Sequence, residues 1–99
     1  MRTYYRQDTV FATQHSSDRC RQRGIKTKDI RFAVMNGTII EQYPDDFPFS
    51  SCLICGETED RQIIHIVMSD EGTGSRIITA YYPDPQRWDA EFKIRKERL

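Results

Sequence analysis

The sequence predicts an α+β fold: a helical hairpin, then a four-stranded antiparallel sheet, then a C-terminal helix. Two segments with helix caps and helix-ending glycines come first, and four short runs rich in β-branched and apolar residues follow. The loops between those runs are short enough for neighbouring strands to pair antiparallel. A length of 99 residues fits one domain, 1–99, with one modest core.

The first helix is expected over residues 13–23. Thr13 or Ser16 is suited to cap its start, and Gly24 is suited to end it. A second helix is expected from an N-cap at Thr27 to the Asn36-Gly37 pair. Its apolar residues recur at i, i+3 and i+4, the spacing of an inward helical stripe: Ile30, Ala33 and Val34.

The four strands follow the helices, and the proline, glycine and acidic residues between them are typical of turns. The predicted strands are Thr38–Tyr43, Ser51–Glu57, Gln62–Met68 and Arg76–Tyr82. The first 12 residues are ambiguous, with Thr9–Phe11 as a candidate short strand.

A last helix is expected from Asp84-Pro85, because Asp is a good N-cap and Pro suits the first helical position. Trp88, Phe92 and Leu99 would share one face of this helix. Residues 89–99 would form its tail.

Composition and charge favour a soluble intracellular protein. No apolar run is long enough to cross a bilayer, and the N-terminus lacks the apolar core of a signal peptide, so we expect no membrane contact and a cytoplasmic location. The net charge is zero, but residues 1–31 hold 8 Lys and Arg against 3 Asp and Glu, while residues 32–75 hold 1 against 8. A basic patch of this kind can meet an anion, although solvated helix faces also carry such charges.

The three cysteines do not indicate a disulfide framework, because their number is odd. Cys52 and Cys55 have the spacing of half a zinc site, but both fall in one apolar strand and would point to opposite faces. Ordinary buried thiols are the favoured interpretation, so no metal and no cofactor are expected.

Two groups of polar residues have the chemistry of a site. His15, Arg19 and Arg23 recur every four residues on the first helix, where they would form a stripe able to clamp a phosphate. Thr79 and Tyr81 would share one face of the last strand with Ile77. Each group also has a plain structural interpretation, as a solvated helix face and as good strand formers.

His65 stands among aliphatic residues in the middle of the third strand. A titratable ring there is either a hydrogen-bonded core histidine or a site residue facing a cleft. The residues alone favour the core by about two to one.

Taken together, these residues and the Ile78–Trp88 strand and turn resemble a bacterial and archaeal family catalogued as domain of unknown function 4258. The resemblance covers about residues 13–88. That family is held to be distant kin of the RelE and BrnT toxins, the ribonucleases of type II toxin–antitoxin pairs. The resemblance implies a RelE-like fold, with helices on one sheet face and RNA on the other.

The function implied is an mRNA interferase that cleaves single-stranded RNA without a metal, by attack of the ribose 2′-OH on the adjacent phosphate. His65, Tyr81 and His15 would supply the base and the acid, while Arg19, Arg23 and Thr79 would hold the phosphate. The implied partner is a neutralising antitoxin, of the MqsA zinc-finger kind. The alternative is a non-catalytic protein-interaction or RNA-binding module of the same fold.

Overall fold

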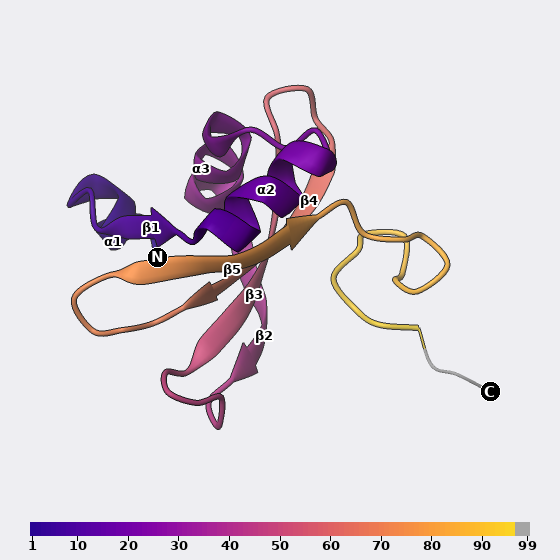
Figure 1. The fold of residues 1–99 in the computed structure, drawn as a ribbon. Helices are drawn as coiled ribbons and strands as arrows, with labels where there is room; N and C mark the ends of the chain where they lie inside the picture. Colours follow the sequence, from indigo (N-terminus) through magenta and orange to yellow (C-terminus); the bar gives the residue numbers. More distant parts are fainter. Residues whose placement is uncertain (97–99) are drawn as a thin grey trace.

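The computed structural model describes residues 1–96 and combines helices with one five-stranded sheet (Figure 1). The elements in chain order are α1 (Arg2–Arg6), β1 (Val10–Ala12), α2 (Gln14–Gln22), α3 (Thr27–Asn36), β2 (Thr38–Tyr43), β3 (Ser51–Glu57), β4 (Ile63–Ser69) and β5 (Ser75–Tyr81). No helix in this part of the chain is long and apolar enough to cross a membrane.

The sheet has the strand order β1-β5-β4-β3-β2 and is mixed, which corrects the prediction of four antiparallel strands. Strands β2 to β5 form the expected antiparallel meander. Strand β1 adds to the far edge, parallel to β5, with Phe11 opposite Arg76. A three-residue strand has too little periodicity to reveal a partner 65 positions away, so the sequence pattern identified the segment without its pairing.

The helices cover one face of the sheet and enclose the main core. Helix α2 packs against β5 and runs alongside it, while α3 packs against β3 (Figure 1). Thr13 caps α2 by accepting a hydrogen bond from the Ser16 backbone N–H. Lys26, and not Thr27, is the N-cap of α3. The core residues contributed by α3 are the predicted stripe of Ile30, Ala33 and Val34.

A β-bulge corrects the predicted faces of β5. Thr79 and Tyr81 do share a face, because they lie opposite Val67 and His65 of β4. The pairing then shifts, so that Ile77 joins the helix-side core while Ile78 is 47% exposed. A bulge inserts one residue into the alternation, which a strict period of two does not foresee.

The predicted C-terminal helix is absent from residues 83–96, which form turns instead. Phe92 has a φ of 60°, and a residue in the left-handed region interrupts a helix. The Asp89 carboxylate accepts hydrogen bonds from the Lys93 and Ile94 backbone N–H groups, which folds the segment back on itself. Leu99, expected on the same helix face, lies outside the described residues.

Candidate functional site

His65 of β4 lies on the sheet face away from the helices, and its ring is fully buried. Its Nε2 lies 2.7 Å from the Phe92 carbonyl oxygen, and its Nδ1 lies 3.3 Å from the Tyr81 hydroxyl. A carbonyl oxygen only accepts, so Nε2 carries the proton. In the neutral ring Nδ1 is then the acceptor, and the Tyr81 hydroxyl donates to it.

The segment after β5 covers this histidine. The Trp88 ring, which is 3% exposed, packs edge-on against the His65 ring with centroids 4.5 Å apart. Arg95 lies over Trp88 at 4.6 Å and donates two hydrogen bonds to Glu41 of β2, at 2.8 and 3.1 Å. We call residues 83–96 the C-terminal cover. The sheet face expected to be open to RNA is therefore closed at its centre.

Burial sets the proton chemistry of the pair beneath the cover. It lowers the pKa of His65 below 6.5, more than the hydrogen bond to Phe92 and the nearby Glu41 raise it. Burial also raises the pKa of Tyr81 above 10. At neutral pH the pair is therefore a neutral phenol that donates to a neutral imidazole.

Arg23 joins this pair at the edge of the sheet. From the end of α2 its Nη1 donates to Thr79 Oγ1 at 3.1 Å and to the Ala80 carbonyl oxygen at 2.7 Å. Thr79 and Tyr81 are both half-buried and lie on the face that carries His65. The structure thus brings four of the six predicted site residues to one end of β5: Arg23, Thr79, Tyr81 and His65.

The other two predicted residues follow the same side of α2 but lie farther away. Arg19 and His15 are exposed and stand one and two helical repeats before Arg23. At a rise of 1.5 Å per residue, His15 is about 12 Å along the helix from Arg23. Since α2 runs alongside β5 from near Ile77 to Ala80, His15 lies at the end away from Tyr81. His15 and His65 do not converge on one cleft.

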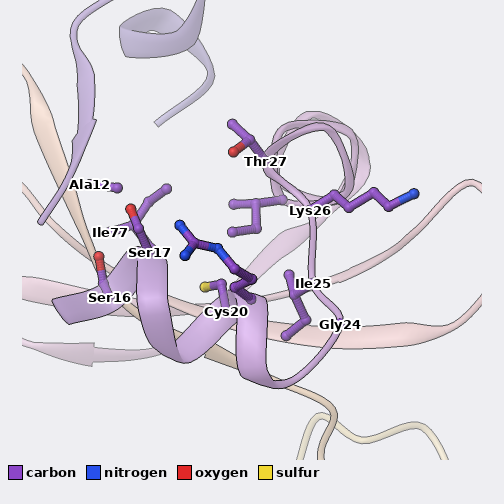
Figure 2. A pocket seen from close by; sticks show the side chains of 11 residues that line it. Ala12, Ser16, Ser17, Cys20, Gly24, Ile25, Lys26, Thr27 and Ile77 are labelled. Atoms are coloured by element: carbon purple, nitrogen blue, oxygen red, sulfur yellow. The ribbon is translucent and has the colours of Figure 1, made fainter. Parts of the chain in front are cut away.

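A cavity of about 550 Å³ lies elsewhere, between α2 and the start of α3. Figure 2 shows Ser17 and Cys20 on the α2 side and Thr27 on the α3 side, while Lys26 extends away. None of the six predicted residues lines it. Its wall mixes aliphatic side chains with serine, threonine, lysine and arginine, and it contains no His, Asp or Glu.

The cysteines lie apart from each other. Cys52 belongs to the helix-side core, whereas Cys55 lies opposite His65 on the other face, and burial raises the pKa of both thiols. Among residues 1–96, no group of three or more His, Cys, Asp or Glu side chains is placed to hold a metal ion.

Sequence reasoning missed the residues of the cover that surround His65. No sequence pattern links the Phe92 carbonyl, Arg95 and Glu41. Arg95 and Glu41, which form the ion pair, are 54 positions apart in the chain. Trp88 was a usable signal, since a single tryptophan in a polar tail needs a place to be buried.

Comparisons with known proteins give one match. A family model described as Domain of unknown function (DUF4258) matches residues 12–82, which span α2, α3 and strands β2 to β5. The match ends where the C-terminal cover begins. No curated protein and no solved structure matches the chain.

Proposed function

The chain belongs to the family described as Domain of unknown function (DUF4258), and we propose that it is a toxin-like ribonuclease, distantly related to RelE and BrnT. Its substrate would be single-stranded RNA, which it would cleave without a metal at the end of β5. The observation that carries this proposal is the contact of Arg23 with Thr79 beside the Tyr81–His65 hydrogen bond. It combines a cation for the phosphate with a proton acceptor for the 2′-OH.

Arg23 is the phosphate ligand in this proposal. Its Nη1 is engaged with Thr79 and Ala80, but its Nε and Nη2 donate to no other described residue. A guanidinium presents five N–H donors in a planar fork, so the free side can bind two phosphate oxygens. The bonds from Nη1 hold the fork at the sheet edge. This preorganisation favours charge that builds up on the phosphate during attack.

Tyr81 and His65 act together as the base. The Tyr81 oxygen takes the 2′ proton while its own proton passes to His65 Nδ1. The 2′ oxygen bonds to phosphorus, and the bond from phosphorus to the 5′ oxygen breaks. The 5′ oxygen takes a proton from solvent, leaving a 2′,3′-cyclic phosphate and a 5′-OH. Because the raised pKa of Tyr81 disfavours the free phenolate, the phenol needs His65 as an acceptor behind it.

His15 and Arg19 bind RNA next to the cleavage point and take no part in the chemistry. At a rise of 1.5 Å per residue, about 12 Å of helix separates His15 from Arg23. The two side chains are therefore too far apart to contact the same phosphate. Arg19, one repeat away, is within reach of a neighbouring phosphate. The helix stripe is thus a track for the RNA backbone.

Incubation of the purified protein with single-stranded RNA in EDTA tests the proposal. We expect cleavage products ending in 2′,3′-cyclic phosphate. Arg23→Ala should lower the rate by about 10²–10³-fold, the loss typical of one transition-state donor. Tyr81→Phe should lower it by about 10²–10⁴-fold, as for a lost general base. Arg21→Ala, an exposed arginine on the same helix, is the control and should keep the rate.

Uncleaved RNA, or full activity in both Arg23→Ala and Tyr81→Phe, would refute the ribonuclease proposal. The second candidate function is then an RNA-binding or protein-interaction module without catalysis. The observation that favours it is the cover over His65, since a buried base has no direct path to a substrate. Binding of RNA that depends on Arg23 but leaves the RNA intact would support it.

The proposed partner is an antitoxin of the small zinc-finger kind, by the family resemblance alone. The contacts in the cover limit how such a partner would bind: it cannot dock on a helix that presents Trp88, because Trp88 is turned inward against His65. Co-purification with the product of the adjacent gene tests the partner.

A further inference from the structure

A polar hollow of about 280 Å³ lies directly beyond Arg23, where α2 turns into α3. We propose that this hollow binds the nucleobase next to the phosphate held by Arg23, and that the preferred base is guanine. The inference rests on the proposed function and adds to it a base preference. The walls of the hollow come from the α2–α3 connection, the β3–β4 turn and the residue after β5: Gly24, Lys26, Lys28, Asp29, Thr58, Glu59, Asp60, Gln62 and Tyr82.

The hollow is continuous with the phosphate site. Gly24 in its wall follows Arg23 in the chain, and Tyr82 follows Tyr81. Arg23 contacts the Ala80 carbonyl oxygen at 2.7 Å, and Tyr82 is two residues further along the chain. At a strand rise of 3.3 Å per residue, the phosphate ligand and the tyrosine are about 7 Å apart along the chain. That spacing suits the phosphate and base of adjoining nucleotide units.

Tyr82 supplies a stacking surface. It is 40% exposed, directly follows β5 and lies beside charged turns. An exposed aromatic ring in a polar hollow is the feature that proteins use to stack single-stranded bases. The carboxylates of Asp29 and Asp60 lie near enough to raise the pKa of Tyr82, after the effect of its burial. The ring is therefore flanked by hydrogen-bond acceptors.

The charges of the hollow select a base over a phosphate. Lys26 and Lys28 line the hollow together with three carboxylates, so a further anion is disfavoured. Asp29 is already engaged with the Lys26 backbone N–H at 3.1 Å. Glu59 and Asp60 remain as acceptors, and the lysines are donors. Guanine has the matching edges, with acceptors at O6 and N7 and N–H donors at N1 and N2.

The turn that carries these groups is held in place. The Thr58 hydroxyl is the acceptor for the Gln62 backbone N–H at 3.2 Å, and Thr58 is 3% exposed. The Thr58 backbone N–H donates to the Gln62 carbonyl oxygen at 2.9 Å. The acceptors of the β3–β4 turn are thus positioned before any base binds, which lowers the cost of ordering them.

Binding of the four nucleoside 3′-monophosphates, followed by amide chemical shifts, tests the inference without requiring cleavage. We expect the guanosine nucleotide to bind at least about tenfold tighter than the others, the range of one good base contact. Tyr82→Ala should weaken it about tenfold, as for a lost stacking ring, whereas Tyr82→Phe should keep the affinity. Phe47→Ala, a 95% exposed aromatic on the β2–β3 loop, is the control and should have no effect.

The outcomes separate this inference from the proposed ribonuclease. Equal binding of the four nucleotides overturns the base preference, whether or not RNA is cleaved. Unchanged guanosine binding in Tyr82→Ala overturns the hollow as the site. Tyr82-dependent guanosine binding by a protein that leaves RNA intact supports the hollow and contradicts the ribonuclease alone. Asp60→Asn gives a second variant, which should reduce the preference for guanine and leave binding of the uridine nucleotide unchanged.

Discussion

His65 shows how burial and hydrogen bonding together give one residue a defined chemical state. The Phe92 carbonyl fixes the proton on Nε2, which leaves Nδ1 to accept from Tyr81. The residue is both a core histidine, as its aliphatic neighbours indicated, and a candidate proton acceptor. The full burial of the ring beneath the C-terminal cover agrees with the core interpretation and not with a histidine that faces an open cleft.

The buried neutral ring makes folding stability depend on pH. The folded pKa of His65 is lowered below 6.5, so under acid conditions the unfolded chain takes up a proton that the folded chain resists. The contribution of His65 to stability should be fully present above about pH 6.5 and should be lost as the pH falls toward the folded pKa. Urea unfolding between about pH 7.5 and 5.5 measures this, a range in which carboxylates stay ionised.

Replacement of each histidine assigns the effect. His65→Phe should lose about 1–3 kcal/mol at neutral pH, because the Phe92 carbonyl is left unpaired, and should lose the acid-dependent fall. His15→Gln, at an exposed position, should keep the fall because His65 is still present. An unchanged fall in His65→Phe would contradict the assignment.

The C-terminal cover is an element without regular secondary structure, held by a small number of contacts. Trp88 and Arg95 pair through a single antiparallel bridge within the cover, and Arg95 ties it to β2 through Glu41. The hydrogen bond from Arg95 is the main reason that the pKa of Glu41 is lowered. Exposed ion pairs contribute little to stability, but this one also positions a cation over Trp88.

Removal of the Arg95 guanidinium should loosen the cover. Trp88 is the single tryptophan, so its fluorescence reports on the cover alone. Arg95→Ala should shift the emission to longer wavelength and increase quenching by acrylamide, because the buried indole gains contact with water. The matched control is Arg76→Ala. It removes the ion pair between Arg76 and Glu71, whose N–O distance is 3.2 Å and which lies outside the cover. Equal emission in Arg95→Ala and wild type would show that the cover holds without the ion pair.

The close contact between α3 and β3 requires a glycine at position 56. A Cβ on Gly56 would lie 2.1 Å from the Ala33 carbonyl oxygen, and the clash is with backbone. Gly56→Ala should therefore displace α3 and lower the free energy of unfolding by about 3 kcal/mol, the upper range for overpacking.

Gly72→Ala is the comparison, since a Cβ there meets nothing within 4 Å and only the φ of +82° is strained. That change should cost about 1 kcal/mol. Denaturant unfolding of both variants measures the difference. Equal losses would mean that α3 adapts to the added methyl group.

Across the whole molecule, the sequence predicted the parts with local signals and missed those that depend on distant contacts. The bounds of α2, α3 and β2 to β5 follow within about one residue from caps, glycines and β-branched runs. The parallel pairing of Val10–Ala12 with β5 and the burial of Trp88 depend on long-range packing. Asp84-Pro85 is a genuine helix-start signal, but tertiary contacts of Trp88 and Arg95 outweighed that propensity.

The candidate site likewise contains residues that the sequence predicted and residues that it did not. Arg23, Thr79, Tyr81 and His65 were chosen as polar residues among apolar neighbours, and the structure gathers them at one end of β5. His15 was also chosen, but helical rise carries it out of reach. The base hollow around Tyr82 had no signal, because its walls come from three separate turns and strand ends.

The central claim is that the 2′-OH of RNA attacks the phosphate held at Arg23. The most direct measurement compares one oligonucleotide as RNA with the same sequence carrying 2′-deoxyriboses, in EDTA, with wild type and Tyr81→Phe. The account predicts that wild type cleaves the RNA, that the deoxy oligonucleotide stays intact, and that Tyr81→Phe is slower by at least about 10²-fold. Cleavage of both oligonucleotides, or of neither, would contradict it.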